Sequence, residues 1–251
     1  VLLQPSGRVK DGEFLDIGDA GRRIQAQVHK KKHGIFLDID EGSVDYLHQQ
    51  RLSDVPLPPY IKRQTDDGDE SAYQTVYARE EGSIAAPTAG FHFTRELLER
   101  IRMKGVQIVE VVLHIGYGTF RLISAAEIEA HIMLPEYSLL TEEAAVALNQ
   151  ALSEERRIIA VGTSVTRVLE SAYSQEVHKV LPYEGYTELF IRPGYRFKVV
   201  GALVTNFHLP KTSLLALVYA FAGKEAVQSL YQDAIEHHYR FYSYGDAMFL
   251  F

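Results

Sequence analysis

A repeated order of apolar strand, polar loop and capped helix constrains the fold of this chain more than any other feature. Residues 157–172 show this order, with Gly162-Thr163-Ser164 as the loop. Residues 198–222 show it again, with residues 206–211 as the loop. Strands that alternate with helices predict an α/β fold, and the loops that follow parallel strands meet at one edge of the sheet. We therefore expect an α/β domain with its functional groups at that edge.

The first part of the chain has a different pattern. Residues 13–17, 23–30 and 34–39 are short alternating runs, and turn pairs such as Asp11-Gly12 separate them. This pattern predicts a small all-β domain over residues 1–55, either an open sheet or a barrel. The Pro56–Pro59 run is a stiff connector, so we assign residues 56–251 to the larger α/β domain.

A helix and a strand in the middle of the chain have histidines beside them. Thr94 can cap the helix and Gly105 can end it. Residues 106–115 are mostly apolar and predict a strand that is buried on both faces. His92 precedes the helix, and His114 lies at the far end of the strand. Both imidazoles are therefore expected in loops on a rigid framework, where sites tend to form.

Composition limits the classes of protein that this chain can belong to. With 46% hydrophobic residues in 251, it can bury a large core. The longest apolar run, 214–223, is too short to cross a bilayer, and no signal peptide pattern occurs. The absence of cysteine excludes disulfides and thiolate metal sites and fits a cytoplasmic protein. The chain begins at Val1 and its first methionine is Met103, so we expect a further segment upstream.

The formal charge of −7 is unfavourable for binding RNA, because phosphate contacts need lysine and arginine. Basic residues nevertheless gather locally, for example in the HKKKH run at residues 29–33. Such a run can be either a solvated face or a phosphate contact. The net charge therefore leaves RNA binding open.

Seven segments of the sequence, in this order, carry a resemblance to a known family. They are PLPPYIKR (56–63), YQTVYA (73–78), APTAGFHFT (86–94), LHIGYGTFR (113–121), VGTSVTRVLES (161–171), PGYRFKVVGALVTNFHLPKTSLLALVYAFAG (193–223) and YRFYSYGDAM (239–248). Together they resemble the S-adenosylmethionine:tRNA ribosyltransferase-isomerase family of queuosine biosynthesis. The sequence departs from the family at Leu134, where a second histidine is usual, so any role of that histidine is absent or supplied elsewhere.

The resemblance implies a large, barrel-like α/β catalytic domain with a small all-β, barrel-like domain inserted into it, and with the opening part of the catalytic domain upstream of Val1. It also implies the reaction: the ribosyl part of S-adenosylmethionine is transferred and isomerised onto 7-aminomethyl-7-deazaguanine at the tRNA wobble position. Epoxyqueuosine forms, and adenine and methionine leave. S-adenosylmethionine is then a substrate, so no cofactor is expected. The expected partners are that tRNA and S-adenosylmethionine, with a monomeric protein and no membrane.

The implied reaction needs a base near the C5′ proton, an acid for the departing adenine, and polar groups that hold the ribose. Histidine suits proton transfer near neutral pH. The candidates for acid–base catalysis are His92, His114, His131 and His208. Each of them can instead be a buried histidine that only makes structural hydrogen bonds.

Candidate binding residues lie in the same loops. Hydroxyl residues that open a helix after a strand can bind an anion, and arginine suits a carboxylate or a phosphate. Carboxylates can hold the ribose hydroxyls. Tyrosines, including Tyr117, can stack on a base. A helix cap, a salt bridge or core packing is the structural alternative for each. The candidates are Tyr60, Lys62, Arg63, Thr88, Gly118, Thr119, Glu136, Thr163, Ser164, Arg167, Asn206, Lys211, Tyr239, Arg240, Tyr244 and Asp246.

Other kinds of site are not indicated. His237 and His238 are adjacent, without the spacing of helical metal ligands, so no metal is expected. Gly116-Tyr117-Gly118 lacks the third glycine of a dinucleotide fingerprint. Two alternative functions remain: another S-adenosylmethionine-dependent RNA-modifying enzyme, such as a methyltransferase, and a non-catalytic RNA-binding homologue. Product identity separates them, because methyl transfer leaves S-adenosylhomocysteine.

Overall fold

The computed structural model describes residues 8–18, 23–31, 34–40, 42–43, 55, 57–58, 60–66, 68–120, 122–123 and 128–251. The chain divides into two compact units, Val1–Val55 and Pro56–Phe251, which are described separately below. Several predictions fall outside the described residues: those for Pro56, Pro59 and Arg121, for the end of the HKKKH run at residues 32–33, and for the side chain of Tyr117.

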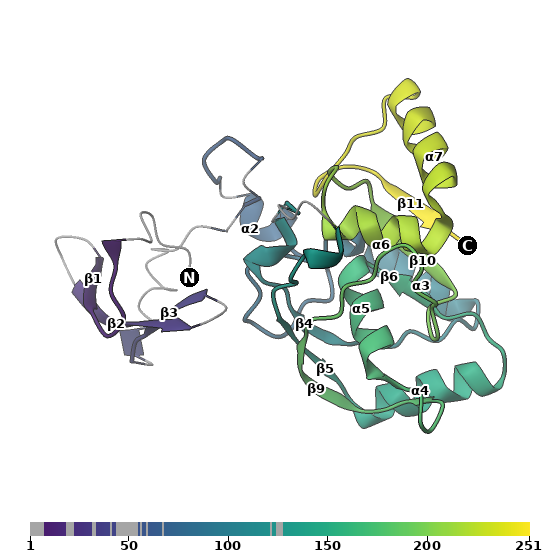
Figure 1. Cartoon of the computed structure of the whole chain (residues 1–251), viewed down its shortest axis with the longest axis horizontal. Helices are drawn as coiled ribbons and strands as arrows, with labels where there is room; N and C mark the ends of the chain where they lie inside the picture. The colour runs from purple at the N-terminus through teal and green to yellow at the C-terminus, as the bar shows by residue number, and fades with distance from the viewer. Residues whose placement is uncertain are drawn as a thin grey trace. The chain divides into compact units, whose positions relative to one another are not determined.

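The first unit contains a three-stranded antiparallel meander in the order β1-β2-β3, drawn in purple in Figure 1. The strands are β1 (Phe14–Gly18), β2 (Arg23–Lys31) and β3 (Gly34–Asp38). Ile24, Ala26 and Val28 alternate along β2 and are almost fully buried, because side chains two residues apart share one face of a strand. The predicted strands are confirmed.

The second unit contains two three-stranded sheets and a short hairpin. In the first sheet, β10 (Ala202–Asn206) lies between β6 (Ile159–Val161), to which it is parallel, and β11 (Ala247–Leu250), to which it is antiparallel. The second sheet is antiparallel, in the order β4 (Val112–His114), β5 (Glu136–Leu140) and β9 (Tyr183–Thr187). The hairpin joins β7 (Tyr173–Ser174) to β8 (Lys179–Val180).

The helix predicted after Thr94 begins as expected, whereas the helix predicted after the loop 162–164 already begins at Thr163. The helices of the second unit are α2 (Asp69–Ala72), α3 (Arg95–Met103), α4 (Glu142–Ser153), α5 (Thr163–Ala172), α6 (Ser213–Ala222) and α7 (Lys224–Glu236), with 3-10 turns at η2 (Thr88–His92), η3 (Tyr117–Phe120) and η4 (Ile128–Ala130). The hydroxyls of Thr94, Thr141 and Thr212 each accept a backbone N–H at the start of α3, α4 and α6. None of the helices in the described ranges is long and apolar enough to cross a membrane.

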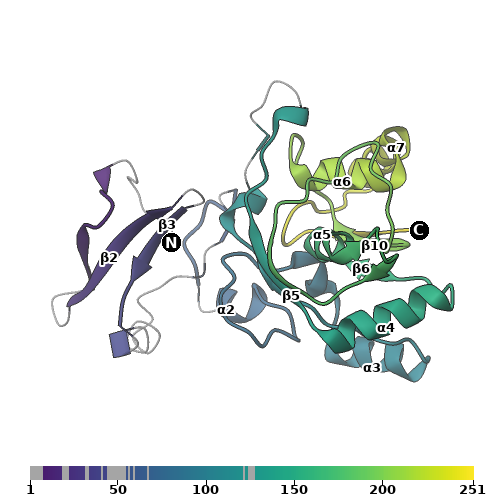
Figure 2. The ribbon, with the colours of Figure 1, turned by 60° about the horizontal axis from the view of Figure 1, so that its bottom comes forward.

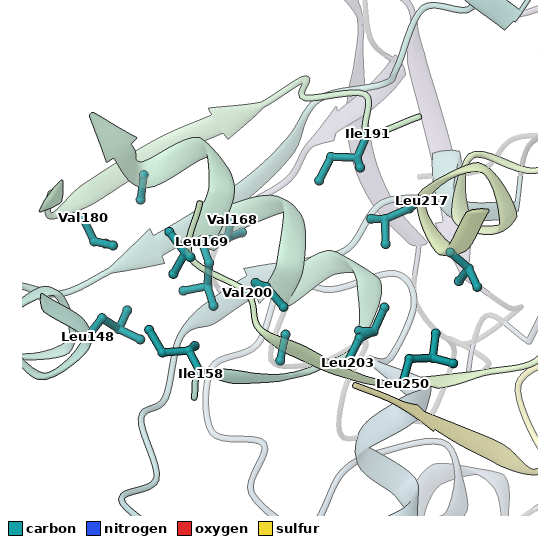
Figure 3. Packing of buried hydrophobic residues seen from close by; sticks show 14 of the residues in the cluster. Leu148, Ile158, Val168, Leu169, Val180, Ile191, Val200, Leu203, Leu217 and Leu250 are labelled. Atoms are coloured by element: carbon teal, nitrogen blue, oxygen red, sulfur yellow. The ribbon is translucent and has the colours of Figure 1, made fainter. Parts of the chain in front are cut away.

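Helix α5 organises the core of this unit. It contacts β6 and β10 of one sheet and β5 and β9 of the other (Figure 2). Val168 and Leu169 of α5 point into a cluster of buried side chains that includes Leu148, Leu203 and Leu217 (Figure 3). Because α5 is buried, the loop that joins it to β6 is held against a rigid framework.

Two expectations need correction. The run 106–115 pairs as a strand only over Val112–His114, because β5 offers a partner only to those three residues. The mixed α/β class is confirmed, whereas no sheet among the described residues closes into a barrel.

Candidate active site at the strand ends of the larger unit

A cavity lies where β6 and β10 end. The two strands are parallel, so the loops that follow Val161 and Asn206 lie at one edge of the sheet, where ligands bind in open α/β folds. The cavity is lined by polar groups from six separate segments, among them Tyr60, Thr88, Thr119, Thr163, Ser164, Thr205, Asn206, His208, Thr212, Tyr242 and Ser243.

Asn206, the last residue of β10, connects three of these segments. Its side chain is buried, with only 2% of the residue exposed. The amide Nδ2 lies 3.2 Å from the carbonyl oxygen of Tyr242 and 3.3 Å from Nε2 of His92. Its Oδ1 accepts a hydrogen bond from the hydroxyl of Thr88, at 3.2 Å. One amide therefore joins the end of the strand to the 3-10 turn η2 and to the loop before β11.

The loop before β11 adopts a restricted backbone conformation. Tyr242 has a φ of 74°, which is uncommon for a residue other than glycine, and its N–H donates to Phe207 O at 3.0 Å. A Cβ on Gly245 would overlap the backbone of Arg240 and Phe241. The hydroxyls of Tyr60 and Ser243 are 2.5 Å apart, and this contact holds the loop against Tyr60. Strained backbone of this kind clusters at functional sites.

His208 lines the cavity in the neutral form. Its ring Nε2 is 2.7 Å from the hydroxyl of Thr205, and the backbone N–H of His208 donates to the hydroxyl of Tyr231 at 2.8 Å. Burial of the imidazole lowers the pKa of His208 to about 4. The ring is therefore uncharged at neutral pH and retains a basic nitrogen.

His92 lies beside the cavity and is hydrogen-bonded to the lining residue Asn206. Partial burial lowers the pKa of His92, whereas the carboxylate of Asp246 opposes that effect and Arg240 adds to it. Arg240 and Asp246 bind each other at 3.0 Å in the exposed part of the loop.

The loop between β6 and α5 contributes backbone donors. Gly162 has a φ of 104°, and no side chain caps the first turn of α5. Thr163 and Ser164 line the cavity. The free N–H groups of a first helical turn attract negative charge, so the predicted anion site stays a prediction with suitable local geometry.

Two predicted binding residues bind each other instead of facing the cavity. The guanidinium of Arg167 on α5 forms a buried ion pair with the carboxylate of Glu136 on β5. Arg167 also donates to the carbonyl oxygens of Leu189 and Thr187. Burial raises the pKa of Glu136, and the guanidinium opposes that rise. The pair links helix α5 to the second sheet.

His114 and His131 also lie outside the cavity lining. His114 packs on the ring of Tyr137, with centroids 5.1 Å apart, and its buried Nε2 has no hydrogen-bond partner among the described residues. His131 packs edge-on against Phe190. Of the four candidate histidines, His208 is the one that lines the cavity. His92 contacts the lining residue Asn206, and the placement of His114 outside the lining corrects its prediction as a site residue.

The remaining predicted residues lie around this framework. Arg63 makes two hydrogen bonds to Asp69, of 2.5 and 2.6 Å, and the hydroxyl of Tyr244 donates to the same carboxylate. Lys62 and Lys211 are exposed, and Tyr239 packs edge-on against Phe207. Leu134 packs against Gly118, so that a Cβ added to Gly118 would lie only 2.9 Å from the side chain of Leu134.

Several lining residues were not predicted. Thr205 directly precedes Asn206 at the end of a strand, so its position in the sequence could have predicted that it lines the cavity. Tyr242 and Ser243 reach the cavity because of the loop conformation, which local sequence patterns do not indicate. Within the described part of the chain, no three His, Asp or Glu side chains come together as metal ligands.

The fold and the site define an α/β protein with a polar cavity at the ends of parallel strands, as in many enzymes. A model of the family described as queuosine biosynthesis protein matches residues 1–250. The chain belongs to this family.

Individual relatives agree with this assignment. The chain is 49% identical over 251 residues to the S-adenosylmethionine:tRNA ribosyltransferase-isomerase of Desulforamulus reducens, covering 99% of this chain and 72% of the relative. It is 47% identical over 260 residues to the protein of the same name from Natranaerobius thermophilus, covering 100% and 72%. The crystal structure of S-adenosylmethionine tRNA ribosyltransferase from Thermotoga maritima is similar with a TM-score of 0.54 and 32% identity, over 99% of this chain and 68% of that one.

Proposed function

We propose that this protein is an S-adenosylmethionine:tRNA ribosyltransferase-isomerase. It transfers and isomerises the ribosyl part of S-adenosylmethionine onto 7-aminomethyl-7-deazaguanine at the tRNA wobble position. The products are epoxyqueuosine-tRNA, adenine and methionine, and S-adenosylmethionine is consumed as a substrate without a further cofactor. The observation that carries the proposal is the polar cavity at the ends of β6 and β10, in a chain that matches the family along its length.

The cavity offers groups suited to this substrate. Tyr60 and Tyr242 line it with ring centroids 5.1 Å apart, and aromatic faces attract a sulfonium cation or stack on adenine. The first turn of α5 presents N–H groups to the methionine carboxylate or to a phosphate. His208 is neutral and so has one ring nitrogen with a lone pair that can accept a proton, although the burial that lowers its pKa to about 4 also makes it a weaker base. The proposal therefore gives a partner to the sulfonium or adenine, to the carboxylate and to the proton that is removed.

Product analysis tests the proposal against its two alternatives. The protein is incubated with S-adenosylmethionine and a tRNA carrying 7-aminomethyl-7-deazaguanine, and small molecules and digested tRNA are analysed by mass spectrometry. We expect stoichiometric adenine, methionine and epoxyqueuosine. S-adenosylhomocysteine would indicate methyl transfer, and tRNA binding without any of these products would indicate a passive binder.

The role of His208 is tested by a matched pair of variants. We expect His208→Gln to lower turnover by about 10²–10⁴-fold, the usual contribution of a positioned acid or base. His178→Gln is the control, because His178 is exposed at the β7–β8 hairpin. Unchanged turnover in His208→Gln would remove this residue from the mechanism.

A further inference from the structure

The orientation of the Asn206 amide is fixed by its surroundings. Its Nδ2 lies 3.2 Å from Tyr242 O and 3.5 Å from Gly245 O. Carbonyl oxygens only accept hydrogen bonds, so Nδ2 and not Oδ1 lies on this side, with one of its two N–H groups donated to the nearer oxygen, Tyr242 O, and the other left for a second acceptor. The opposite orientation would place Oδ1 against two carbonyl oxygens in a buried site, where an unsatisfied polar contact is costly. The hydroxyl of Thr88, 3.2 Å from Oδ1, supplies the hydrogen bond that the carbonyl of the amide needs.

This orientation determines which nitrogen of His92 carries the proton. Nδ2 of Asn206 is also 3.3 Å from Nε2 of His92. A donor in this position requires Nε2 to present its lone pair. A neutral imidazole has one protonated nitrogen, which must then be Nδ1. Within the described residues, no hydrogen bond reaches Nδ1 of His92.

We infer that Asn206 is a positioning residue that holds His92 in the Nδ1-protonated tautomer, so that His92 offers the substrate an N–H donor and is not the general base. The substrate part of this inference rests on the proposed function, in which the acceptor is a ribose oxygen or an adenine nitrogen of S-adenosylmethionine. A neutral imidazole that donates a hydrogen bond stabilises charge that develops on its acceptor during the reaction. Proton abstraction is then left to another group, and His208 is the lining residue with a basic nitrogen.

A spectroscopic experiment tests the tautomer independently of any activity. The full chain is labelled with ¹⁵N-histidine, and two-bond ¹H–¹⁵N correlations are recorded at neutral pH. The His92 signals are those that disappear in His92→Gln. We expect Nε2 to have the shift of an unprotonated nitrogen and Nδ1 that of a protonated one. A protonated Nε2 in the wild-type protein would overturn the inference, even if the protein has the proposed activity.

The variant Asn206→Asp reverses the hydrogen bond. A carboxylate only accepts, so His92 should become protonated at Nε2 and its pKa should rise, with Asp246 adding to that rise and Arg240 opposing it. Thr88→Val is the matched control, because it removes the contact to Oδ1 and leaves both carbonyls that orient the amide. We expect it to keep the Nδ1-protonated tautomer.

Kinetics then test the donor role. We expect Asn206→Asp to lower kcat at least tenfold with little change in KM, and to move the acidic limb of the pH profile to higher pH. A structural role alone would lower the amount of folded protein without moving that limb. If the tautomer of His92 is the same in Asn206→Asp and wild type, Asn206 does not set it. If Asn206→Asp does not fold, the wild-type and Thr88→Val spectra still decide.

Discussion

The Asn206 junction consists of buried Asn206 with His92 and His208 beside it, and the Glu136–Arg167 pair is buried on both sides. The sequence nominated all five residues for the site. At the junction, Asn206 is hydrogen-bonded on both sides, while His92 keeps one nitrogen without a partner among the described residues and His208 lines a cavity. In the pair, Arg167 donates to Glu136 and to two backbone carbonyls. The two regions differ in how many of their hydrogen-bonding groups are already used. The junction keeps donors and acceptors for a ligand, whereas the pair uses its donors and acceptors to hold α5 against the second sheet.

The strongest test of this comparison is to break the ion pair. We expect Arg167→Met to lower the free energy of unfolding by about 3–5 kcal/mol, because Glu136 would be left as an uncompensated buried charge. Urea denaturation measures the change. The double variant with Glu136→Leu should recover much of the stability. A variant with normal stability but without adenine release would show instead that Arg167 binds substrate.

Acid pH should weaken the fold through His208. Its pKa is lowered from 6.5 to about 4 in the folded protein, so the unfolded chain takes up a proton first as the pH falls. The stability that the neutral ring contributes is complete above about pH 6.5 and is lost between pH 6.5 and 4, by up to about 3 kcal/mol. Urea unfolding at a series of pH values measures this slope. The same slope in His208→Gln would assign it to other groups.

The loop before β11 should tolerate no side chain at Gly245. We expect Gly245→Ala to cost about 1–3 kcal/mol, as overpacking does, because its Cβ would overlap the backbone of Arg240 and Phe241. Displacement of the loop would also move a carbonyl that faces Asn206, so turnover should fall as well. Gly116→Ala is the control, since a Cβ there meets nothing within 4 Å. Equal stability of the two variants in thermal unfolding would contradict the described loop.

The smallest expected effect concerns a helix cap far from either region. Thr141→Ala removes the hydroxyl that accepts from Ala144 N at 3.2 Å, and it should cost about 1 kcal/mol. Turnover at a temperature where the variant is folded should be unchanged. A large loss of turnover would mean that α4 influences the cavity, and it would contradict the expected independence of this cap from the site.

Local patterns predicted the elements well and the partners of individual side chains poorly. The predicted cap at Thr94 depends on a neighbour three residues away and is confirmed, and Thr141 and Thr212 cap their helices in the same way. The run 106–115 is mostly unpaired, because pairing requires a second strand. Glu136 and Arg167 are 31 residues apart, and their pairing results from packing of α5 on the second sheet.

The cavity was predictable only in outline. Asn206 and Thr163 were nominated because they follow strands, and both line the cavity. The contribution of Tyr242 depends on a positive φ in the loop before β11, which the surrounding residues do not signal. Long-range contacts therefore decide which polar residues line the cavity and which equally polar residues stabilise the fold.

The central claim is that the ligand occupies the cavity at the ends of β6 and β10, next to His208 and the His92–Asn206 junction. The most direct measurement is a set of ¹³C-histidine spectra of the protein with precursor tRNA, recorded before and after addition of S-adenosylmethionine. The claim predicts that the ring signals of His92 and His208 shift while those of His131 and His178 do not. Shifts confined to His131, or none at His92 and His208 while adenine is released, would contradict it.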